Sequence, residues 1–403
     1  MKYTADEVLQ FVREESVQFI RLAFCDVYGR QKNISILPGE LRRAFDSGIA
    51  IDASAIAGFG GQVYSDLFLR PDPSTLTGLP WRSENGKVMR MFCDIIRPDG
   101  SPFPADTRRL LQQAVAAARQ AGYRFSFGAE MEFYLFRADQ EGESTNIPYD
   151  RAGYMDIAPA DKGENIRREI CLILEQMGIL PESSHHEEGP GQNEIDFRYA
   201  DPLTAADDAI TFRSVVQTIA GYNGLYADFS PKPLPQEPGS GLHINLSLAG
   251  DPGEEPMPQV IAGLMEHIYD ITAFLNPTQT SYQRLGSSKA PGYITWSSQN
   301  RSQLVRVPAA TGEYRRVELR SPDPTANPYL AFALLIYAGL DGIRRALPLP
   351  PSADFNIYEA PAAQLAAYRH LPRSLEEARR AAGASQFVRT HLPPEILAAY
   401  TGS

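Results

Sequence analysis

The sequence lacks the features of a secreted, membrane-spanning or nucleic-acid-binding protein. Its three cysteines, Cys25, Cys93 and Cys171, lie far apart, so they form no C-x-x-C pair, and such sparse cysteine fits a reducing cytoplasm. No run of about 18 apolar residues occurs, which disfavours a membrane-spanning helix. Lys and Arg number 38 against 49 Asp and Glu, a net charge of −11, which disfavours nucleic acid or an anionic membrane as a partner. We therefore expect a cytoplasmic protein whose partners are small molecules.

Familiar nucleotide-binding and nucleophile motifs are also missing. There is no G-x-x-x-x-G-K-[ST] loop, and the glycines near 189–191 and 239–241 do not fit G-x-G-x-x-G. Nothing resembles a G-x-S-x-G elbow or the kinase signatures. The two standard nucleotide-binding folds are therefore disfavoured.

The length of 403 residues favours two domains, at roughly 100–200 residues each. The apolar run Phe19–Cys25, followed by a turn at Tyr28-Gly29 and the stretch Lys32–Ile36, predicts a hairpin in a small α+β unit. The Pro- and Gly-containing segment at 97–102 is the best boundary. Beyond it, helix-like and strand-like stretches alternate. We predict an N-terminal domain at residues 1–100 and a catalytic α+β domain at 101–403.

Charged residues alternate with apolar ones in four strand-like segments. In the first, Glu130 and Glu132 share one face, roughly 6.6 Å apart at about 3.3 Å per residue. The opposite face is apolar and is expected to be buried. The same alternation occurs at 194–198, 242–248 and 314–320. An ordinary antiparallel sheet with one wetted face would also show this pattern, but glutamate is a poor strand former and recurs here.

If the four charged faces converge, they form one acidic cluster around an imidazole. Its members would be Glu130, Glu132, Glu187, Glu194, Glu318 and His243. Such a cluster repels itself and raises its own pKa values unless cations neutralise it. Oxygen ligands with one imidazole favour Mg²⁺ or Mn²⁺ over zinc. Five carboxylates suit two to three such ions.

Arginines are concentrated near the last of these segments. One stretch of 37 residues contains Arg284, Arg301, Arg306, Arg316 and Arg320. Guanidinium groups bind phosphate and carboxylate through a planar fork. Paired metal ions beside several arginines are typical of phosphoryl transfer. By contrast, we expect structural roles for the adjacent His185 and His186, and an ordinary loop position for Tyr358.

Eight sequence blocks, taken together and in order, resemble glutamine synthetase, specifically its bacterial type I form, along nearly the whole chain. The blocks are Asp52–Ile56, Gly128–Phe133, His186–Glu194, Pro231–His243, Ser281–Leu285, Asn300–Pro308, Arg316–Arg320 and Pro322–Leu330. The resemblance implies an N-terminal β-grasp domain followed by a catalytic domain with a curved antiparallel sheet flanked by helices. It also implies a homo-oligomer, a double hexameric ring with sites between subunits.

The resemblance also implies roles for individual residues. Glu132, Glu187 and Glu194 would hold one divalent cation, and Glu130, His243 and Glu318 the other. Glutamate would be bound by Arg284, Arg320 and Gly239. ATP would be bound by Arg301, Arg306, Arg316, Asn245 and Ser247. The catalytic residues would be Asp52, Arg301 and Glu318, with Asp52 acting across the subunit interface near the incoming ammonium.

The implied function is that of a carbon–nitrogen ligase of nitrogen metabolism. It would activate the γ-carboxylate of glutamate with ATP as γ-glutamyl phosphate, and then join it to ammonia or another amine. The alternative is a family member that lacks ammonia ligation and acts as a nucleotide- or glutamate-binding regulatory protein.

Three departures from the family pattern fall near the acceptor and nucleotide sides. The flap segment after Leu285 is one residue shorter and has Lys289 where the family has a glutamate. A cation there would repel ammonium. Asn245 replaces a histidine and Pro238 replaces an asparagine. The identity of the amine or of the carboxylate therefore stays open, and Lys289 could pair with an acidic group on a different substrate.

Overall fold

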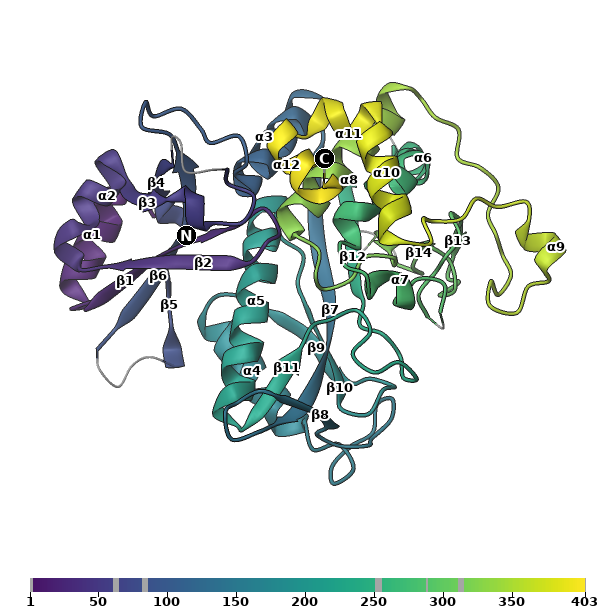
Figure 1. Cartoon of the computed structure of the whole chain (residues 1–403), viewed down its shortest axis with the longest axis horizontal. Helices are drawn as coiled ribbons and strands as arrows, with labels where there is room; N and C mark the ends of the chain where they lie inside the picture. The colour runs from purple at the N-terminus through teal and green to yellow at the C-terminus, as the bar shows by residue number, and fades with distance from the viewer. Residues whose placement is uncertain are drawn as a thin grey trace.

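The computed structural model describes residues 3–60, 65–81, 86–250, 256–287, 289–310 and 315–402. The chain builds two sheets that lie side by side, with the N-terminal part at the left of Figure 1 and the C-terminal helices packed above the second sheet. Within the described ranges, no helix is both long and apolar enough to cross a membrane.

The first sheet has the strand order β2-β1-β6-β4-β3, with β5 beside β6. Its strands are β1 (Phe19–Cys25), β2 (Gln31–Ile36), β3 (Ile49–Asp52), β4 (Asp66–Pro71), β5 (Thr77–Gly78) and β6 (Val88–Ile96). The predicted hairpin is confirmed, because β1 pairs antiparallel with β2. On its other edge β1 pairs parallel with β6. Helices α1 (Ala5–Glu14) and α2 (Leu41–Ser47) belong to this part.

The second sheet has the order β13-β14-β15-β12-β7-β10-β9, and β8 and β11 also pair with β7. Its strands are β7 (Arg124–Ala138), β8 (Ser144–Pro148), β9 (Pro181–His186), β10 (Gln192–Phe197), β11 (Leu225–Asp228), β12 (Leu242–Ala249), β13 (Trp296–Ser298), β14 (Val305–Val307) and β15 (Val317–Leu319). Its strand pairs are antiparallel except β13 with β14. The predicted curved, antiparallel catalytic sheet is thus confirmed, with one parallel pair at its edge.

Helices cover the apolar face of this sheet. The helices of this part of the chain are α3 (Thr107–Gln120), α4 (Glu164–Gln176), α5 (Pro202–Tyr222), α6 (Met257–Leu275), α7 (Ser281–Arg284), α8 (Pro328–Arg344), α9 (Ala362–Leu365), α10 (Leu375–Ala384), α11 (Gln386–His391) and α12 (Pro394–Thr401). Of these, α3, α4 and α5 contact strands of the sheet directly, and α8 packs against β7. Phe127, Met131 and Phe133 of β7 are at most 1% exposed. Phe127 stacks on Phe332 of α8 with ring centroids 4.4 Å apart. Because apolar side chains occupy this face, the alternating charged ones are left on the other.

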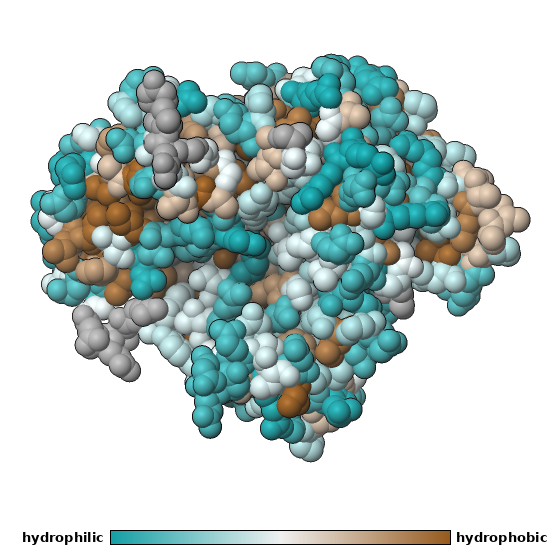
Figure 2. Space-filling view, viewed as in Figure 1, coloured by the Kyte–Doolittle hydropathy of each residue, from teal (hydrophilic) through white to brown (hydrophobic). Residues whose placement is uncertain are grey.

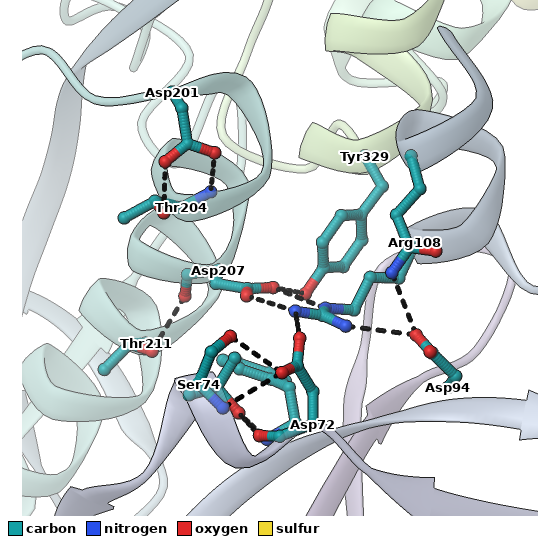
Figure 3. Close-up of polar contacts among 12 residues, drawn as sticks. Asp72, Ser74, Asp94, Arg108, Asp201, Thr204, Asp207, Thr211 and Tyr329 are labelled. Atoms are coloured by element: carbon teal, nitrogen blue, oxygen red, sulfur yellow. Dashed lines mark hydrogen bonds and ion pairs between the residues drawn. The ribbon is translucent and has the colours of Figure 1, made fainter. Parts of the chain in front are cut away.

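A buried arginine connects the two parts of the chain (Figure 3). Arg108 of α3 donates two hydrogen bonds to Asp207 of α5, at 3.1 and 2.9 Å, and one each to Asp72 and Asp94 from the N-terminal part, at 2.9 and 3.1 Å. The Tyr329 hydroxyl of α8 also donates to Asp207, at 2.6 Å. The Arg108 side chain is only 4% exposed. Burial disfavours its charge, but Asp207 outweighs that and raises the pKa of Arg108 well above its ordinary value.

Replacing this arginine should therefore destabilise the fold. Arg108→Met leaves three carboxylates without their shared cation, and breaking a buried ion pair costs about 3–5 kcal/mol. We expect a loss of that size in the free energy of unfolding, measured by urea denaturation. The matched control is Arg119→Met, an exposed arginine on the same helix, which should change stability by less than about 0.5 kcal/mol. Equal effects of the two substitutions would contradict this role for Arg108.

Candidate functional site

The charged face of the second sheet forms the floor of a cavity of about 990 Å³. Among the residues that line it are Glu130, Glu132, Glu187, Glu194, Asp196, His243, Arg301, Arg306, Arg316 and Arg320. Strand pairing explains the convergence: Glu132 lies opposite Glu194, and Glu130 lies between Asp196 on one side and His243 on the other. The four charged strand faces predicted from the sequence therefore meet in one place.

One predicted ligand trio is assembled directly. The ligand atoms of Glu130, His243 and Glu318 all lie within 4.8 Å of one another. The His243 Nδ1 atom is 3.3 Å from Glu130 Oε2 and 3.9 Å from Glu318 Oε1. This arrangement, with carboxylate oxygens and one imidazole nitrogen, has the donor set of a divalent cation site.

The other predicted trio is divided between two overlapping groups centred on Glu194. One comprises Glu132, Glu194 and His243, and the other His185, Glu187 and Glu194. In each group the ligand atoms again lie within 4.8 Å of one another. Glu132, Glu187 and Glu194 are thus brought to one region, but His185 lies among them as an additional nitrogen donor.

The electrostatics of the acidic cluster fit bound cations. Burial, reinforced by Glu132 and Asp196, raises the pKa of Glu194 well above its ordinary value. Burial and the nearby Glu130 raise the pKa of Asp196 to about 6. The buried Oδ1 atom of Asp196 also has no hydrogen-bond partner. Carboxylates this close together stay ionised at the same time only when positive charge lies between them. A metal ion bound by these carboxylates and His243 supplies that charge.

Arginines neutralise the opposite end of the cavity. Arg306 donates to Glu318 at 2.6 Å, and Arg320 also pairs with Glu318. Burial acts to raise the pKa of Glu318, but Arg320, His243 and Arg306 outweigh it and hold that pKa at about 2. Arg316 donates to Asn245 Oδ1 at 3.1 Å. Glu318 is therefore ionised without a metal ion.

Arg284 and Gly239 are packed against each other at the edge of the cavity. Arg284 donates to the carbonyls of Ser321 and Arg320, at 2.7 and 3.3 Å. A Cβ atom on Gly239 would lie 2.5 Å from the Pro231 carbonyl oxygen and 2.8 Å from Arg284 Cγ, so this approach requires glycine. Both residues line the cavity, and their role in glutamate binding stays a prediction. Two hydrogen bonds of the Arg284 guanidinium group go to backbone carbonyls rather than into the cavity.

Four predicted site residues are not among those that line the cavity. One is Glu318, whose contacts with Arg306, Arg320 and His243 are given above, and the others are Asp52, Asn245 and Ser247. Asp52, at the end of β3, is exposed, and its carboxylate accepts hydrogen bonds from the Ser54 N–H and hydroxyl at 2.9 and 2.7 Å. Asn245 is buried and donates to Glu130 Oε1 at 2.7 Å, so it orients a predicted ligand. Ser247 lies farther along β12, opposite Ser126.

Several cavity residues were missed by sequence reasoning. Asp196 lies two residues after Glu194 on the same strand, so the alternation in the sequence already placed both side chains on one face. Of the two adjacent histidines, His186 is buried against Asp150 at 2.8 Å, but His185 faces the cavity, 3.0 Å from Glu187 Oε1. Gln192 donates to Glu132 at 3.1 Å. Tyr358 was expected at an ordinary loop position, but its segment lines the cavity. Burial raises the pKa of Tyr358 to about 12, and Arg320 and Arg284 act against that rise.

Lys289 lies at the rim of the cavity. Its ammonium group pairs with Glu188 and lies 5.6 Å from the centroid of the Tyr154 ring. Tyr154 and Lys289 both line the cavity. Lys289 is thus close to the acidic cluster but is already paired with a carboxylate of this chain.

Comparisons with known proteins match both parts of the chain. The glutamine synthetase β-grasp domain model matches residues 16–98, and the glutamine synthetase catalytic domain model matches residues 104–403. Glutamine synthetase from Clostridium saccharobutylicum is 46% identical over 371 residues, 89% of this chain and 84% of that protein. The Methanosarcina mazei enzyme is 42% identical over 413 residues, 98% of this chain and 92% of that protein.

Solved structures agree with these matches. A GmaS/ADP complex superposes with a TM-score of 0.88 at 29% identity, covering 100% of this chain and 94% of that chain. Plasmodium falciparum glutamine synthetase, solved by cryo-EM, gives a TM-score of 0.86 at 22% identity and covers 100% of this chain and 96% of that chain, which supports the fold alone. With both family models matched and both sheets in place, the chain belongs to the glutamine synthetase family and is type I-like.

Proposed function

We propose that this protein is an ATP-dependent ligase that makes γ-glutamyl phosphate from glutamate and joins it to ammonia or another amine. The proposal is based mainly on one observation: acidic residues, His243 and several arginines line the same cavity. The arginines are Arg284, Arg301, Arg306, Arg316 and Arg320. The relatives that are named glutamine synthetase support the same reaction, and the similarity to an ADP complex supports nucleotide binding.

Mg²⁺ or Mn²⁺, two to three ions, would be held by the acidic cluster. We assign one ion to Glu130, His243 and Glu318, and another to the group around Glu194 with Glu132 and Glu187. When bound, such ions neutralise phosphate oxygens and the charge that develops between them. Oxygen-rich donors with an imidazole favour these metals over zinc.

The chain's own residues would position the two substrates. Arg301, Arg306 and Arg316 would bind the phosphates of ATP, and Arg284 and Arg320, with Gly239, the carboxylates of glutamate. A γ-carboxylate oxygen bonds to the γ-phosphorus as the bond to ADP breaks. An uncharged amine then bonds to the carbonyl carbon of the γ-glutamyl phosphate, phosphate leaves with the bonding electrons, and the amine loses a proton. Fixed guanidinium groups lower the repulsion between the carboxylate and the triphosphate.

Asp52 supports an oligomer in which the site lies between subunits. Its carboxylate is exposed in the N-terminal part, away from the residues that line this chain's own cavity. We propose that it reaches the cavity of a neighbouring subunit and orients the amine there, in a double hexameric ring. Figure 2 shows apolar side chains gathered over the N-terminal part. Phe19 and Leu37, which belong to this part of the chain, are 41% and 60% exposed, as expected for a surface that a neighbouring subunit covers.

We keep the domain division at residue 100 and a cytoplasmic location as parts of this proposal.

Removing the charge of Glu318 should abolish the reaction. Glu318→Gln keeps the shape of the side chain but removes a metal ligand and the partner of two arginines, so we expect glutamate-dependent phosphate release from ATP to fall about 100-fold or more. Glu376→Gln, an exposed glutamate on α10, is the matched control. Circular dichroism should show both variants folded. Turnover close to that of the unchanged protein in Glu318→Gln would refute the metal assignment.

The acceptor should be identified by an amine screen. Phosphate release is measured with ATP, glutamate and, one at a time, ammonium, methylamine, ethanolamine, putrescine and hydroxylamine. We expect release to require glutamate together with at least one amine, because the amine removes the acyl phosphate. Silence with every amine despite tight ATP binding would instead favour a binding or regulatory protein.

A further inference from the structure

The turn that joins β1 to β2 is held by the catalytic part of the chain. Its Val27 carbonyl accepts hydrogen bonds from the Asn327 side chain at 3.0 Å and from the Tyr400 hydroxyl at 3.1 Å. Its Gly29 carbonyl accepts one from Arg213 of α5, at 3.0 Å. A Cβ atom on Gly29 would lie 2.9 Å from Asn327 Cα. The backbones of the two parts therefore approach each other closely at this turn.

Arg213 links the turn to a second stretch of backbone. One terminal nitrogen of its guanidinium group donates to the Gly29 carbonyl and the other to the Pro324 carbonyl, both at 3.0 Å. The helix that carries this arginine packs against β7 and β11, which fixes its position. A guanidinium group presents its donors in a rigid planar fork. The two carbonyls are therefore held in a defined relation to each other.

The backbone that Arg213 contacts is a stiff connecting segment, Arg320-Ser-Pro-Asp-Pro324, which begins directly after β15. Each proline ring fixes its own φ angle and restricts the residue before it. All residues of the segment are buried, and Asp323 accepts a hydrogen bond from the Asn276 side chain at 3.0 Å. We therefore expect the connecting segment to move as one piece.

The other end of the connecting segment contacts the cavity. The Ser321 and Arg320 carbonyls accept hydrogen bonds from Arg284, at 2.7 and 3.3 Å. The side chains of Arg284 and Arg320 both line the cavity. Arg213 is not among the described residues that line it. One stiff segment thus contacts Arg213 at one end and two cavity arginines at the other.

We propose that Arg213 is a positioning residue, which sets the orientation of Arg284 and Arg320 through the connecting segment. This inference rests on the proposed ligase function, in which these two arginines bind glutamate. Because Arg213 also holds the β1–β2 turn, the N-terminal part of the chain takes part in orienting the glutamate site of the same chain. The proposed ATP-binding arginines precede the connecting segment and are not held by it.

The test is the substitution Arg213→Lys. It keeps the positive charge, but a single ammonium group does not reproduce the fork that joins the two carbonyls. The net contribution of one hydrogen bond corresponds to a rise of about three- to tenfold in the KM for glutamate. The KM for ATP and kcat at saturating glutamate should stay unchanged. Steady-state phosphate release, with the best amine of the screen, measures all three.

The matched control is Tyr400→Phe. It removes a hydrogen bond to the same turn, at Val27, but leaves Arg213 and Pro324 in contact, so the KM for glutamate should not change. Pro324→Ala is a second test that keeps both hydrogen bonds of Arg213. It keeps the carbonyl group and frees the φ angle, so it should also raise the KM for glutamate. Circular dichroism and thermal unfolding show whether each variant is folded.

Two results would overturn the positioning role. One is an unchanged KM for glutamate in folded Arg213→Lys or, if that variant does not fold, in Pro324→Ala. The other is an equal rise in the KM values for glutamate and ATP together with a fall in kcat, as expected for general structural damage.

Calorimetry separates this proposal from the ligase function. Glutamate is titrated into the protein with Mg²⁺ and a non-hydrolysable ATP analogue, without turnover. The Kd for glutamate should rise in Arg213→Lys by the same factor as the KM and stay unchanged in Tyr400→Phe. Phosphate release by the unchanged protein tests the ligase function on its own, so failure of one proposal is distinguishable from failure of the other.

Discussion

Repulsion among buried carboxylates is the constraint on which this site depends. Glu130, Glu132, Glu194 and Asp196 lie on the paired strands β7 and β10, where Glu194 is buried and the other three are half-buried. Burial and mutual repulsion raise the pKa values of Glu194 and Asp196. At the opposite end, Arg306 and Arg320 hold Glu318 ionised. The acidic end, where no side chain of this chain balances the negative charge, therefore favours the binding of external cations. The arginine end, where Glu318 is already balanced, favours the binding of anions.

The alternation of side chains along a strand made the faces of β7 predictable from the sequence. Glu130 and Glu132 were assigned to one face and Phe127 and Met131 to the other by alternation alone, and the structure has the same arrangement. The convergence of four segments could not be derived from any one of them, because it depends on which strands pair. The ordered sequence blocks supplied that information through resemblance to a family.

What escaped prediction depends on long-range packing. Whether His185 or His186 faces the cavity is decided by the pairing of β9 with β10. Tyr154 and Tyr358 reach the cavity from irregular segments, where no periodicity indicates direction. The Arg108 side chain joins Asp72 to Asp207, which lies 135 positions later in the chain, and no local sequence pattern indicates this contact. These features follow from tertiary contacts rather than from local sequence.

Around Glu130 and Glu132, strand β7 carries core side chains on one face and ligand candidates on the other. A one-residue slip against β10 or β12 would exchange the two faces, placing glutamates among phenylalanines and phenylalanines over the cavity. The strand register that buries the core of this sheet is therefore the same register that assembles the site. An insertion or deletion within β7 would move every later side chain to the opposite face, whereas one in a connecting turn would leave both faces intact.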